Sequence, residues 1–336
     1  GTLAPGFVDL QVNGGGDVML NAQPTPDAVE RIVAAHRGKG TTALLPTVIS
    51  DTRQVQAEAV EAVRAARAAG NASVLGIHIE GPFFAANRRG AHRGDHIRRA
   101  TADDIAWLCS LDEFPVVLTL APEQFDGEQL RTLADSGLVL CAGHTDSSYA
   151  QMREACDNGI SGVTHLFNAM TPLQSREPGA VGAALDLDAL WAGLIADGHH
   201  VHPAAIRLAH RVKPDGRLIL VSDAMGTVGG TRGSCEIYGE TVQEQAGRLV
   251  NGEGRLAGSA IGMIDAVRYA HEEAGIALSD CLRMASSHPA AIIGLAHRIG
   301  SLTPGCRADI VHFDEAFTVH NTWVAGERAN HRTLLT

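Results

Sequence analysis

The chain has few aromatic residues and no long apolar run, and both absences narrow its class. Aromatic residues make up 4% of the 336 residues, whereas apolar residues make up 45%, which is ordinary for a globular protein. No apolar stretch approaches the roughly 20 residues that span a bilayer, and the amino end shows no signal-peptide pattern. We therefore predict a protein that is not associated with a membrane.

An excess of basic charge is also missing. The formal net charge is −11, and non-specific binding of nucleic acid needs a basic surface. We predict no nucleic-acid partner. A small anionic substrate stays possible, provided that donors cluster locally.

Paired cysteine motifs are absent as well. The six cysteines are scattered along the chain and none forms C-x-x-C. This pattern indicates reduced thiols rather than a disulfide framework or a zinc ribbon. We predict a cytoplasmic location.

Eight short apolar runs recur along the chain, separated by helix-like segments. They cover residues 7–13, 41–47, 73–81, 116–123, 138–145, 162–170, 190–198 and 218–225. Such alternation predicts a parallel sheet covered by helices, and eight units over roughly 220 residues fit a (β/α)8 TIM-like barrel. A doubly wound sheet is the alternative, but the first strand lacks a following G-x-G-x-x-G that opens a helix.

Amphipathic stretches between the runs predict helices, and the pattern changes after the eighth run. Helices are expected at 27–40, 52–70 and 147–160, with Ser147 as the cap of the third, and again at 262–274 and 279–293. Residues 235–259 resemble hairpins with "NGEG" as a turn, and 305–329 read as strands. We predict a barrel over 7–299 and a small β-sandwich domain from 1–6 and 300–336.

Candidate metal ligands lie where the predicted strands end. Glu80 ends the third strand, His144 the fifth, and His165 lies on the sixth. The carboxyl ends of barrel strands meet at one face, where three protein ligands and a water make an open catalytic metal site. Asp223, at the end of the eighth strand, is the candidate general base. His78 alternates with Glu80, so both side chains are expected inside the barrel.

A second set of residues suggests an anion site. Arg176 lies in the loop after the sixth strand and His200 after the seventh, while the basic loop 83–100 contains His92. A guanidinium group binds phosphate with two parallel hydrogen bonds, but an isolated surface arginine is equally often part of a salt bridge. These positions therefore predict a phosphate-bearing substrate only in combination.

The motifs together resemble those of the N-acetylglucosamine-6-phosphate deacetylases of the amidohydrolase superfamily. The similar segments include "APGFVDLQVNG", "GIHIEGPF", "AGHTD", "THLFNAM", "REPG", "IADGHHV" and "SDAMG", and they run in family order over nearly the whole chain. Members of this family usually begin with some tens of residues before "PGF" that belong to the small β-domain. The resemblance thus implies that the sequence is incomplete or that this domain lacks strands.

The resemblance assigns roles to individual residues. It implies that Glu80, His144 and His165 bind the principal metal, that Asp223 is the catalytic aspartate, and that His92 polarises the acetyl carbonyl. It implies substrate contacts from the following residues: Asn168, Ala169, Arg176, His200, Gln11 and Met263. His199 and His202 flank His200, so an error of one place is conceivable there. In this family the arginine of "REPG" reaches a neighbouring subunit, which implies a homodimer.

The first strand carries Gln11 and Asn13 where many relatives carry His-x-His. A neutral amide is a poor metal ligand beside imidazole, so we predict one divalent metal ion per subunit. Zn²⁺ is the expected ion, although Fe²⁺ and Co²⁺ suit the same ligands.

The expected reaction is hydrolysis of N-acetylglucosamine 6-phosphate to glucosamine 6-phosphate and acetate in amino-sugar metabolism. Three alternatives stay open. One is a deacetylase for the galactosamine epimer. A second is a dihydroorotase-like cyclic amidase, although no lysine lies at the predicted strand ends for the carboxylated bridge of a two-metal site. The third is a non-catalytic sugar-phosphate sensor, which would not need the base Asp223.

Overall fold

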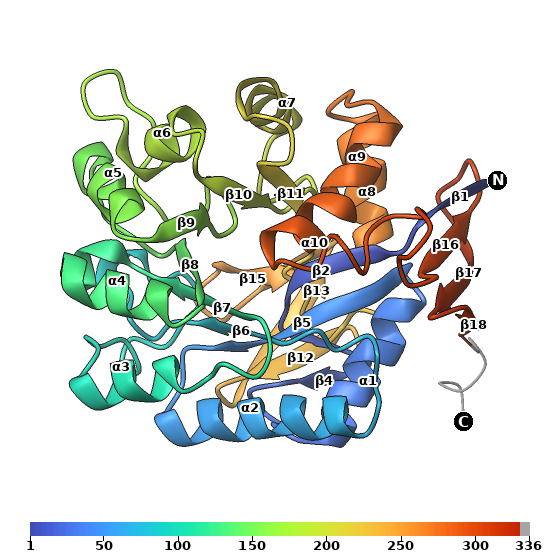
Figure 1. The fold of residues 1–336 in the computed structure, drawn as a ribbon, viewed down its shortest axis with the longest axis horizontal. Coiled ribbons are helices and arrows are strands. Elements are labelled where there is room, and N and C mark those ends of the chain that lie inside the picture. Colours follow the sequence, from blue (N-terminus) through green and yellow to red (C-terminus); the bar gives the residue numbers. More distant parts are fainter. Residues whose placement is uncertain (330–336) are drawn as a thin grey trace.

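A closed parallel barrel forms the centre of the molecule, and the computed structural model describes residues 1–329 (Figure 1). The eight strands are hydrogen-bonded in the order β11-β10-β9-β8-β7-β6-β5-β2. Their bounds are β2 Phe7–Val12, β5 Thr41–Ile49, β6 Ile77–Glu80, β7 Val116–Leu120, β8 Val139–Ala142, β9 Ile160–Val163, β10 Trp191–Leu194 and β11 Leu218–Leu220. Each strand lies in or overlaps one of the eight predicted runs, and the predicted TIM-like barrel is confirmed.

The barrel closes between the first strand and the segment that follows the last. The Asp223 backbone N–H donates to the Gln11 carbonyl at 2.9 Å, and Val12 forms a parallel bridge with Ala224. One side chain assists this closure: Oδ1 of Asp9 accepts the N–H groups of Ser222 and Gln11, each at 3.2 Å. The seam therefore joins residues more than 200 positions apart.

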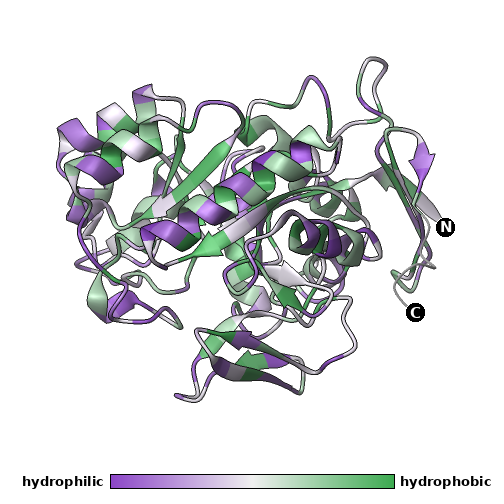
Figure 2. Cartoon of the chain, turned by 90° about the horizontal axis from the view of Figure 1, so that it is seen from below, coloured by the Kyte–Doolittle hydropathy of each residue, from purple (hydrophilic) through white to green (hydrophobic). Residues whose placement is uncertain are grey.

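Helices cover the outside of the barrel (Figure 1). Their bounds are α1 Pro26–Arg37, α2 Arg53–Ala68, α3 Ala102–Cys109, α4 Gly127–Asp135, α5 Tyr149–Asp157, α6 Gly179–Asp186, α7 Pro203–Val212, α8 Met263–Glu272, α9 Leu278–Met284 and α10 Ser287–Ile292. Short 3₁₀ turns lie at Ala86–Arg88 and Pro122–Gln124. In Figure 2 the helices show alternating hydrophilic and hydrophobic stretches, as expected for helices with one buried face.

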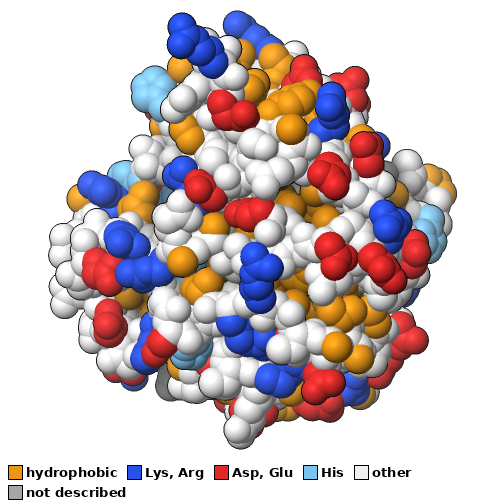
Figure 3. Space-filling model, turned by 90° about the vertical axis from the view of Figure 1, so that its left-hand side faces the viewer, with side chains coloured by type: hydrophobic (Ala, Val, Ile, Leu, Met, Phe, Trp, Pro, Cys, Tyr) orange, Lys and Arg blue, Asp and Glu red, His pale blue; other side chains and the backbone are white. Residues whose placement is uncertain are grey.

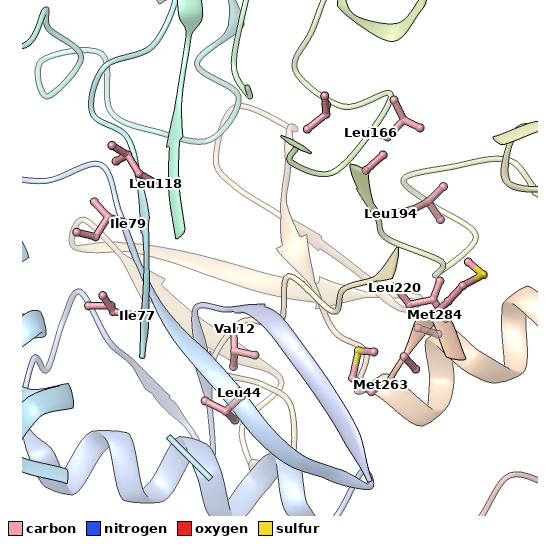
Figure 4. Close-up of a cluster of buried hydrophobic side chains, with 14 of the residues drawn as sticks. Val12, Leu44, Ile77, Ile79, Leu118, Leu166, Leu194, Leu220, Met263 and Met284 are labelled. Atoms are coloured by element: carbon pink, nitrogen blue, oxygen red, sulfur yellow. The ribbon is translucent and has the colours of Figure 1, made fainter. Parts of the chain in front are cut away.

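Successive side chains along each barrel strand point alternately outward to the helices and inward to the barrel axis. The hydrophobic core therefore has an outer layer and an inner layer. Leu118 and Leu120 of β7 face the helices in the main hydrophobic cluster, part of which is shown in Figure 4, whereas Val117 faces the barrel interior. Residues Ala290 and Ile293 at α10 close the bottom of the interior cluster. The alternation also places His78 and Glu80 inside the barrel, because Ile77 and Ile79 lie in the outer layer.

Two small antiparallel sheets flank the barrel. One consists of β12 Ser234–Ile237, β13 Glu240–Gln245, β14 Arg248–Val250 and β15 Leu256–Ser259, with the predicted "NGEG" turn between the last two. The other consists of β1 Thr2–Pro5, β16 Ile310–Phe313, β17 Val319–Val324 and β18 Glu327–Arg328, beside the amino end in Figure 1. A short ribbon pairs β3 Gly14–Gly15 with β4 Val18–Met19. The second sheet corresponds to the predicted small β-domain, whose residues 330–336 lie outside the described part of the chain.

Two local predictions were wrong. The cap of α5 is Ser148, whose Oγ accepts the Gln151 N–H, whereas the buried hydroxyl of Ser147 bonds Glu123. The helix predicted over 279–293 divides into α9 and α10 around Ser286. Pro289 explains the break, because proline has no N–H and its ring would clash with the carbonyl four residues earlier in a continuous helix.

The surface is mixed in charge. On the face shown in Figure 3, acidic and basic side chains are interspersed. Within residues 1–329, no helix has both the length and the apolar character that crossing a bilayer requires.

Candidate active site

Three side chains from three strand ends converge at the carboxyl-terminal face of the barrel. Glu80 Oε1 lies 3.2 Å from His144 Nε2 and 3.1 Å from His165 Nε2, and the two nitrogen atoms are 3.1 Å apart. All three side chains are buried. The structure thus brings together the three predicted metal ligands, which form a Glu/His/His site able to bind a metal ion.

The protonation of His144 shows why a cation fits this place. Its Nδ1 lies 2.9 Å from the Arg88 carbonyl oxygen, which can only accept, so Nδ1 carries the proton and Nε2 keeps its lone pair. That lone pair faces the Glu80 carboxylate. Ligand atoms about 2.1 Å from one tetrahedral ion are about 3.4 Å apart, close to the distances observed here. The donor set therefore suits a divalent transition metal.

Strained backbone marks the same strand ends. His144, His165 and Asp223 all have positive φ angles, of 49°, 34° and 52°. Such angles are uncommon for residues with a side chain, and they gather where a functional geometry must be maintained. The strain turns these three side chains toward one point.

Charges in the site are strongly coupled. Burial acts to raise the pKa of Glu80, but the adjacent imidazoles of His144 and His165 outweigh it and lower that pKa well below its usual value. Burial acts to lower the pKa of His165, but the Glu80 carboxylate outweighs it and raises that pKa. Glu80 is therefore an ionised acceptor between two imidazoles.

Asp223 is held by two amides from the first strand. Its Oδ1 accepts from Asn13 Nδ2 at 2.7 Å and from Gln11 Nε2 at 3.2 Å, and Gln11 also donates to Glu80 Oε2 at 3.2 Å. Burial and the nearby Glu80 charge raise the pKa of Asp223 to about 6. An aspartate with such a pKa can take and return a proton near neutral pH. Gln11 and Asn13 thus orient carboxylates here.

His92 lies beside this centre on the loop between β6 and α3. Its ring packs edge-on against His144, with centroids 4.5 Å apart, and burial lowers its pKa well below the usual value. The imidazole is therefore neutral at physiological pH, so it can donate a hydrogen bond from one nitrogen and accept one at the other.

A cavity of about 380 Å³ opens over these groups, which is large enough for a sugar phosphate. The predicted residues that line it are Glu80, His92, His144, His165, Asn168, Ala169, His200 and Asp223. His200 is fixed by a 2.6 Å contact from its Nδ1 to Asp197 Oδ2. The His202 side chain instead caps α7, so His200 is the histidine of this loop that faces the cavity.

Three predicted substrate contacts are not on the cavity wall within residues 1–329. Gln11 lies beneath it, bonded to Glu80 and Asp223. Met263 is fully buried in the main hydrophobic cluster and does not line the cavity (Figure 4). Arg176 is exposed in the loop before α6, outside the cavity of its own chain.

Several cavity residues were missed from the sequence. Asn87, Arg88 and Arg255 line the rim, and Asn13 lines the cavity beside Asp223. Arg255 comes from the β14–β15 turn and donates to the Gly90 carbonyl at 3.0 Å. The basic composition of the 83–100 loop pointed to Arg88, but no sequence signal placed the distant hairpin over this loop.

Comparisons with known proteins agree with this geometry. The model of the amidohydrolase family matches residues 2–329. An N-acetylgalactosamine-6-phosphate deacetylase of Shewanella sp. (strain ANA-3) is 40% identical over 329 residues, which cover 97% of this chain and 83% of the relative. The crystal structure of an N-acetylglucosamine-6-phosphate deacetylase from Pasteurella multocida is 35% identical with a TM-score of 0.94, covering 97% of this chain and 86% of that one.

A third comparison includes a bound substrate. It is the structure of a mutant N-acetyl-D-glucosamine-6-phosphate deacetylase from Mycobacterium smegmatis in complex with N-acetyl-D-glucosamine 6-phosphate. This structure is 33% identical to the chain with a TM-score of 0.91, and the match covers 98% of this chain and 87% of that one.

The barrel, the Glu/His/His site and the family match define the class of the protein: the chain belongs to the amidohydrolase family of metal-dependent hydrolases. Within this family it is similar over nearly its whole length to the deacetylases of N-acetylated amino-sugar 6-phosphates. The resemblance drawn from the sequence motifs is confirmed.

Proposed function

We propose that this protein hydrolyses the N-acetyl group of N-acetylglucosamine 6-phosphate, giving glucosamine 6-phosphate and acetate. The observation that carries the proposal is the convergence of Glu80, His144 and His165 beside an aspartate whose pKa is raised to about 6, inside a sugar-sized cavity. The relatives named as deacetylases of such sugars support this substrate class.

Glu80, His144 and His165 would hold one divalent ion, for which we propose Zn²⁺, although Fe²⁺ and Co²⁺ suit the same donors. Such an ion supplies Lewis acidity, which acidifies water and polarises a carbonyl group. Within residues 1–329, these three residues are the only group of three or more His, Cys, Asp and Glu side chains close enough to share an ion. Elemental analysis of protein purified without added metal would identify the ion.

Asp223 moves the proton in this mechanism. Asn13 and Gln11 occupy its Oδ1, and no donor from residues 1–329 bonds its Oδ2, which is therefore available to the attacking water. The carboxylate accepts a proton from the water and then delivers it to the departing amine. His92 donates a hydrogen bond to the acetyl oxygen as negative charge develops there.

Asn168, Ala169 and His200 line the cavity, and we propose that they orient the sugar phosphate. Arg176 is exposed outside this cavity. We infer that it completes the phosphate site of a neighbouring subunit in a homodimer, where its guanidinium would meet the phosphate.

The role of Asp223 is tested by Asp223→Asn. Asparagine keeps the shape of the side chain but cannot accept the proton, so acetate release should fall about 100- to 10,000-fold while metal content is unchanged. Asp215→Asn, at an exposed carboxylate, is the control and should keep full activity. Near-wild-type turnover by Asp223→Asn would rule out the proposed base.

Arg176→Ala tests phosphate recognition and the homodimer together. It should lower kcat/KM on the phosphorylated sugar and leave activity on the unphosphorylated sugar unchanged. In a mixed dimer, the Arg176→Ala subunit keeps Asp223 in its own site, and the Asp223→Asn subunit supplies Arg176 to that site. One of the two sites is then complete, so the mixture should regain activity that neither variant has alone. No regain in a verified mixed dimer would show that the arginine does not act across subunits.

A second substrate is favoured by one observation. Curated relatives at 40% and 35% identity are named N-acetylgalactosamine-6-phosphate deacetylases. The two sugars differ only in the configuration at C4, so the same metal, base and phosphate contacts would serve both. Comparing kcat/KM for the two epimers under identical metal loading decides between them.

We propose a cytoplasmic location for the protein. All six cysteines are free thiols, three of them buried, as expected in a reducing compartment. Fractionation of the native host would test this.

A further inference from the structure

We propose that Ser50 and Tyr238 are positioning residues that hold the His92 ring so that Nδ1 accepts hydrogen bonds from Ser50 and the N–H of Nε2 faces the reacting carbonyl. This inference rests on the role proposed for His92 in the reaction. It assigns part of the catalytic geometry to the β12–β15 sheet, which lies outside the barrel strands.

Two hydrogen bonds define the state of the His92 ring. The Ser50 backbone N lies 3.3 Å from Nδ1, and the Ser50 hydroxyl oxygen lies 2.8 Å from the same atom. A backbone N–H can only donate, so Nδ1 must be an acceptor. In a neutral ring the proton is then on Nε2, and no hydrogen bond within residues 1–329 uses that atom. Nε2 is thus a free donor on a ring that lines the cavity.

Ser50 is itself tightly fixed. It follows the last residue of β5, and its side chain is completely buried. The Tyr238 hydroxyl donates to the Ser50 carbonyl oxygen at 2.5 Å. The Ser50 peptide is therefore held at both ends, by the strand that precedes it and by a side chain 188 residues away.

The backbone at Tyr238 is strained, and strained residues of this kind gather at sites where function requires a fixed geometry. Tyr238 and Gly239 form the two-residue turn between β12 and β13, because Ile237 pairs with Glu240. Both turn residues have positive φ angles, 55° and 78°. Turns of this kind strongly prefer asparagine or glycine at the first position, and a tyrosine there is strained. The strained residue is the one whose hydroxyl reaches the barrel.

Packing keeps this hairpin against the barrel mouth. Ile237, Val242 and Leu249 of the small sheet share a buried cluster with Ile49, the neighbour of Ser50, and with Met225. The hydroxyl of Tyr238 is thereby placed by hydrophobic contacts on both sides of the turn. We infer a connected path from the sheet through Ser50 to the donor nitrogen of His92.

Histidine NMR tests the protonation state directly, without substrate. In zinc-loaded protein with ¹⁵N-labelled histidine, the His92 signals are assigned by their loss in His92→Gln. We expect one form protonated on Nε2 in the wild type. In Ser50→Ala, which keeps the backbone N–H but loses the hydroxyl contact, we expect the Nδ1 signal to shift because one of its two hydrogen-bond partners is gone. A proton on Nδ1 in the wild type, or unchanged signals in Ser50→Ala, would overturn the inference.

Kinetics test whether the path serves the reaction. Tyr238→Phe should lower kcat about tenfold with KM and zinc content unchanged, because only the transition state depends on the donor. In a His92→Gln background the same change should have no further effect. Tyr149→Phe removes a comparable 2.5 Å hydroxyl contact, to Asp186, outside the cavity and should leave kcat unchanged.

The two tests separate this inference from the proposed function. Fully additive effects of Tyr238→Phe and His92→Gln would show that Tyr238 does not act through His92. If the wild type hydrolyses neither sugar phosphate, the proposed function fails, while the NMR result still decides the state of His92. If it hydrolyses one and His92 is protonated on Nδ1, only the positioning inference fails.

Discussion

Replacing Asn13 by leucine gives a quantitative prediction about Asp223, the proposed general base. Asn13 Nδ2 donates to Asp223 Oδ1 at 2.7 Å, and leucine has a similar size but no donor. A hydrogen bond to a charged acceptor contributes about 1.5–3 kcal/mol. One pKa unit corresponds to about 1.36 kcal/mol, so loss of this bond should raise the pKa of Asp223 by about 1–2 units.

The sign of the effect on activity follows from the role of the base. Asp223 acts when it is ionised, so activity falls as pH decreases through its pKa. In Asn13→Leu this acid limb of the kcat/KM profile should move to higher pH by about 1–2 units, with the plateau above it largely retained. A bound divalent cation lowers the absolute pKa in both proteins, and the prediction concerns the difference between them.

The assay is acetate release over pH 4–9 with metal content measured at each point. Asn71→Leu is the matched control, because Asn71 also donates to a carboxylate, Glu30, at 2.7 Å on the exposed surface. Its profile should coincide with that of the wild type. An acid limb that does not move in Asn13→Leu, at equal metal occupancy, would refute the assignment of Asp223 as the base held by Asn13.

Three further outcomes are expected. Burial raises the pKa of Asp9 to about 7, so the stabilisation from its protonated form is present below pH 4 and is lost as pH rises towards 7. Relative to Asp9→Asn, the free energy of unfolding of the wild type, measured by urea titration, should fall by up to about 4 kcal/mol over this range. A difference between the two proteins that stays constant with pH would contradict this. A Cβ atom at Gly162 would lie 2.1 Å from the Trp191 ring, so Gly162→Ala should lower the free energy of unfolding by about 1–3 kcal/mol. Gly233→Ala is the control and should leave stability nearly unchanged, because a Cβ atom there meets nothing within 4 Å and the φ angle is not positive. Removing the metal with a chelator should abolish acetate release and lower the melting temperature, and adding Zn²⁺ should restore both; full activity at zero metal would exclude a metal-dependent reaction.

The barrel could be predicted because its signal is repeated and local. Each buried parallel strand is a short apolar run, and the alternation of His78 and Glu80 with two isoleucines placed both polar side chains inside. The metal ligands followed from the rule that barrel strands present their last residues at one face. The resemblance to known deacetylases added the roles of His92 and His200, which periodicity alone does not reveal.

What escaped prediction depends on contacts between distant segments or on single hydrogen bonds. Ser147 and Ser148 are adjacent, and only the geometry decides which hydroxyl caps α5. Met263 has no polar atom to mark it, and packing buries it at the start of α8. The bond from Tyr238 to Ser50 joins a hairpin to a strand with no periodic pattern in either segment.

The seam of the barrel also sets an order of events during synthesis of the chain. Glu80, His144 and His165 all precede residue 166, so every candidate metal ligand leaves the ribosome before Asp223 does. Asp223 and its partner Asn13 meet only when the seam closes, 210 residues apart. On the roles proposed for these residues, the candidate metal ligands are available before the proposed base is in place, and hydrolysis requires a closed barrel. Hydrolytic activity would then report barrel closure during folding.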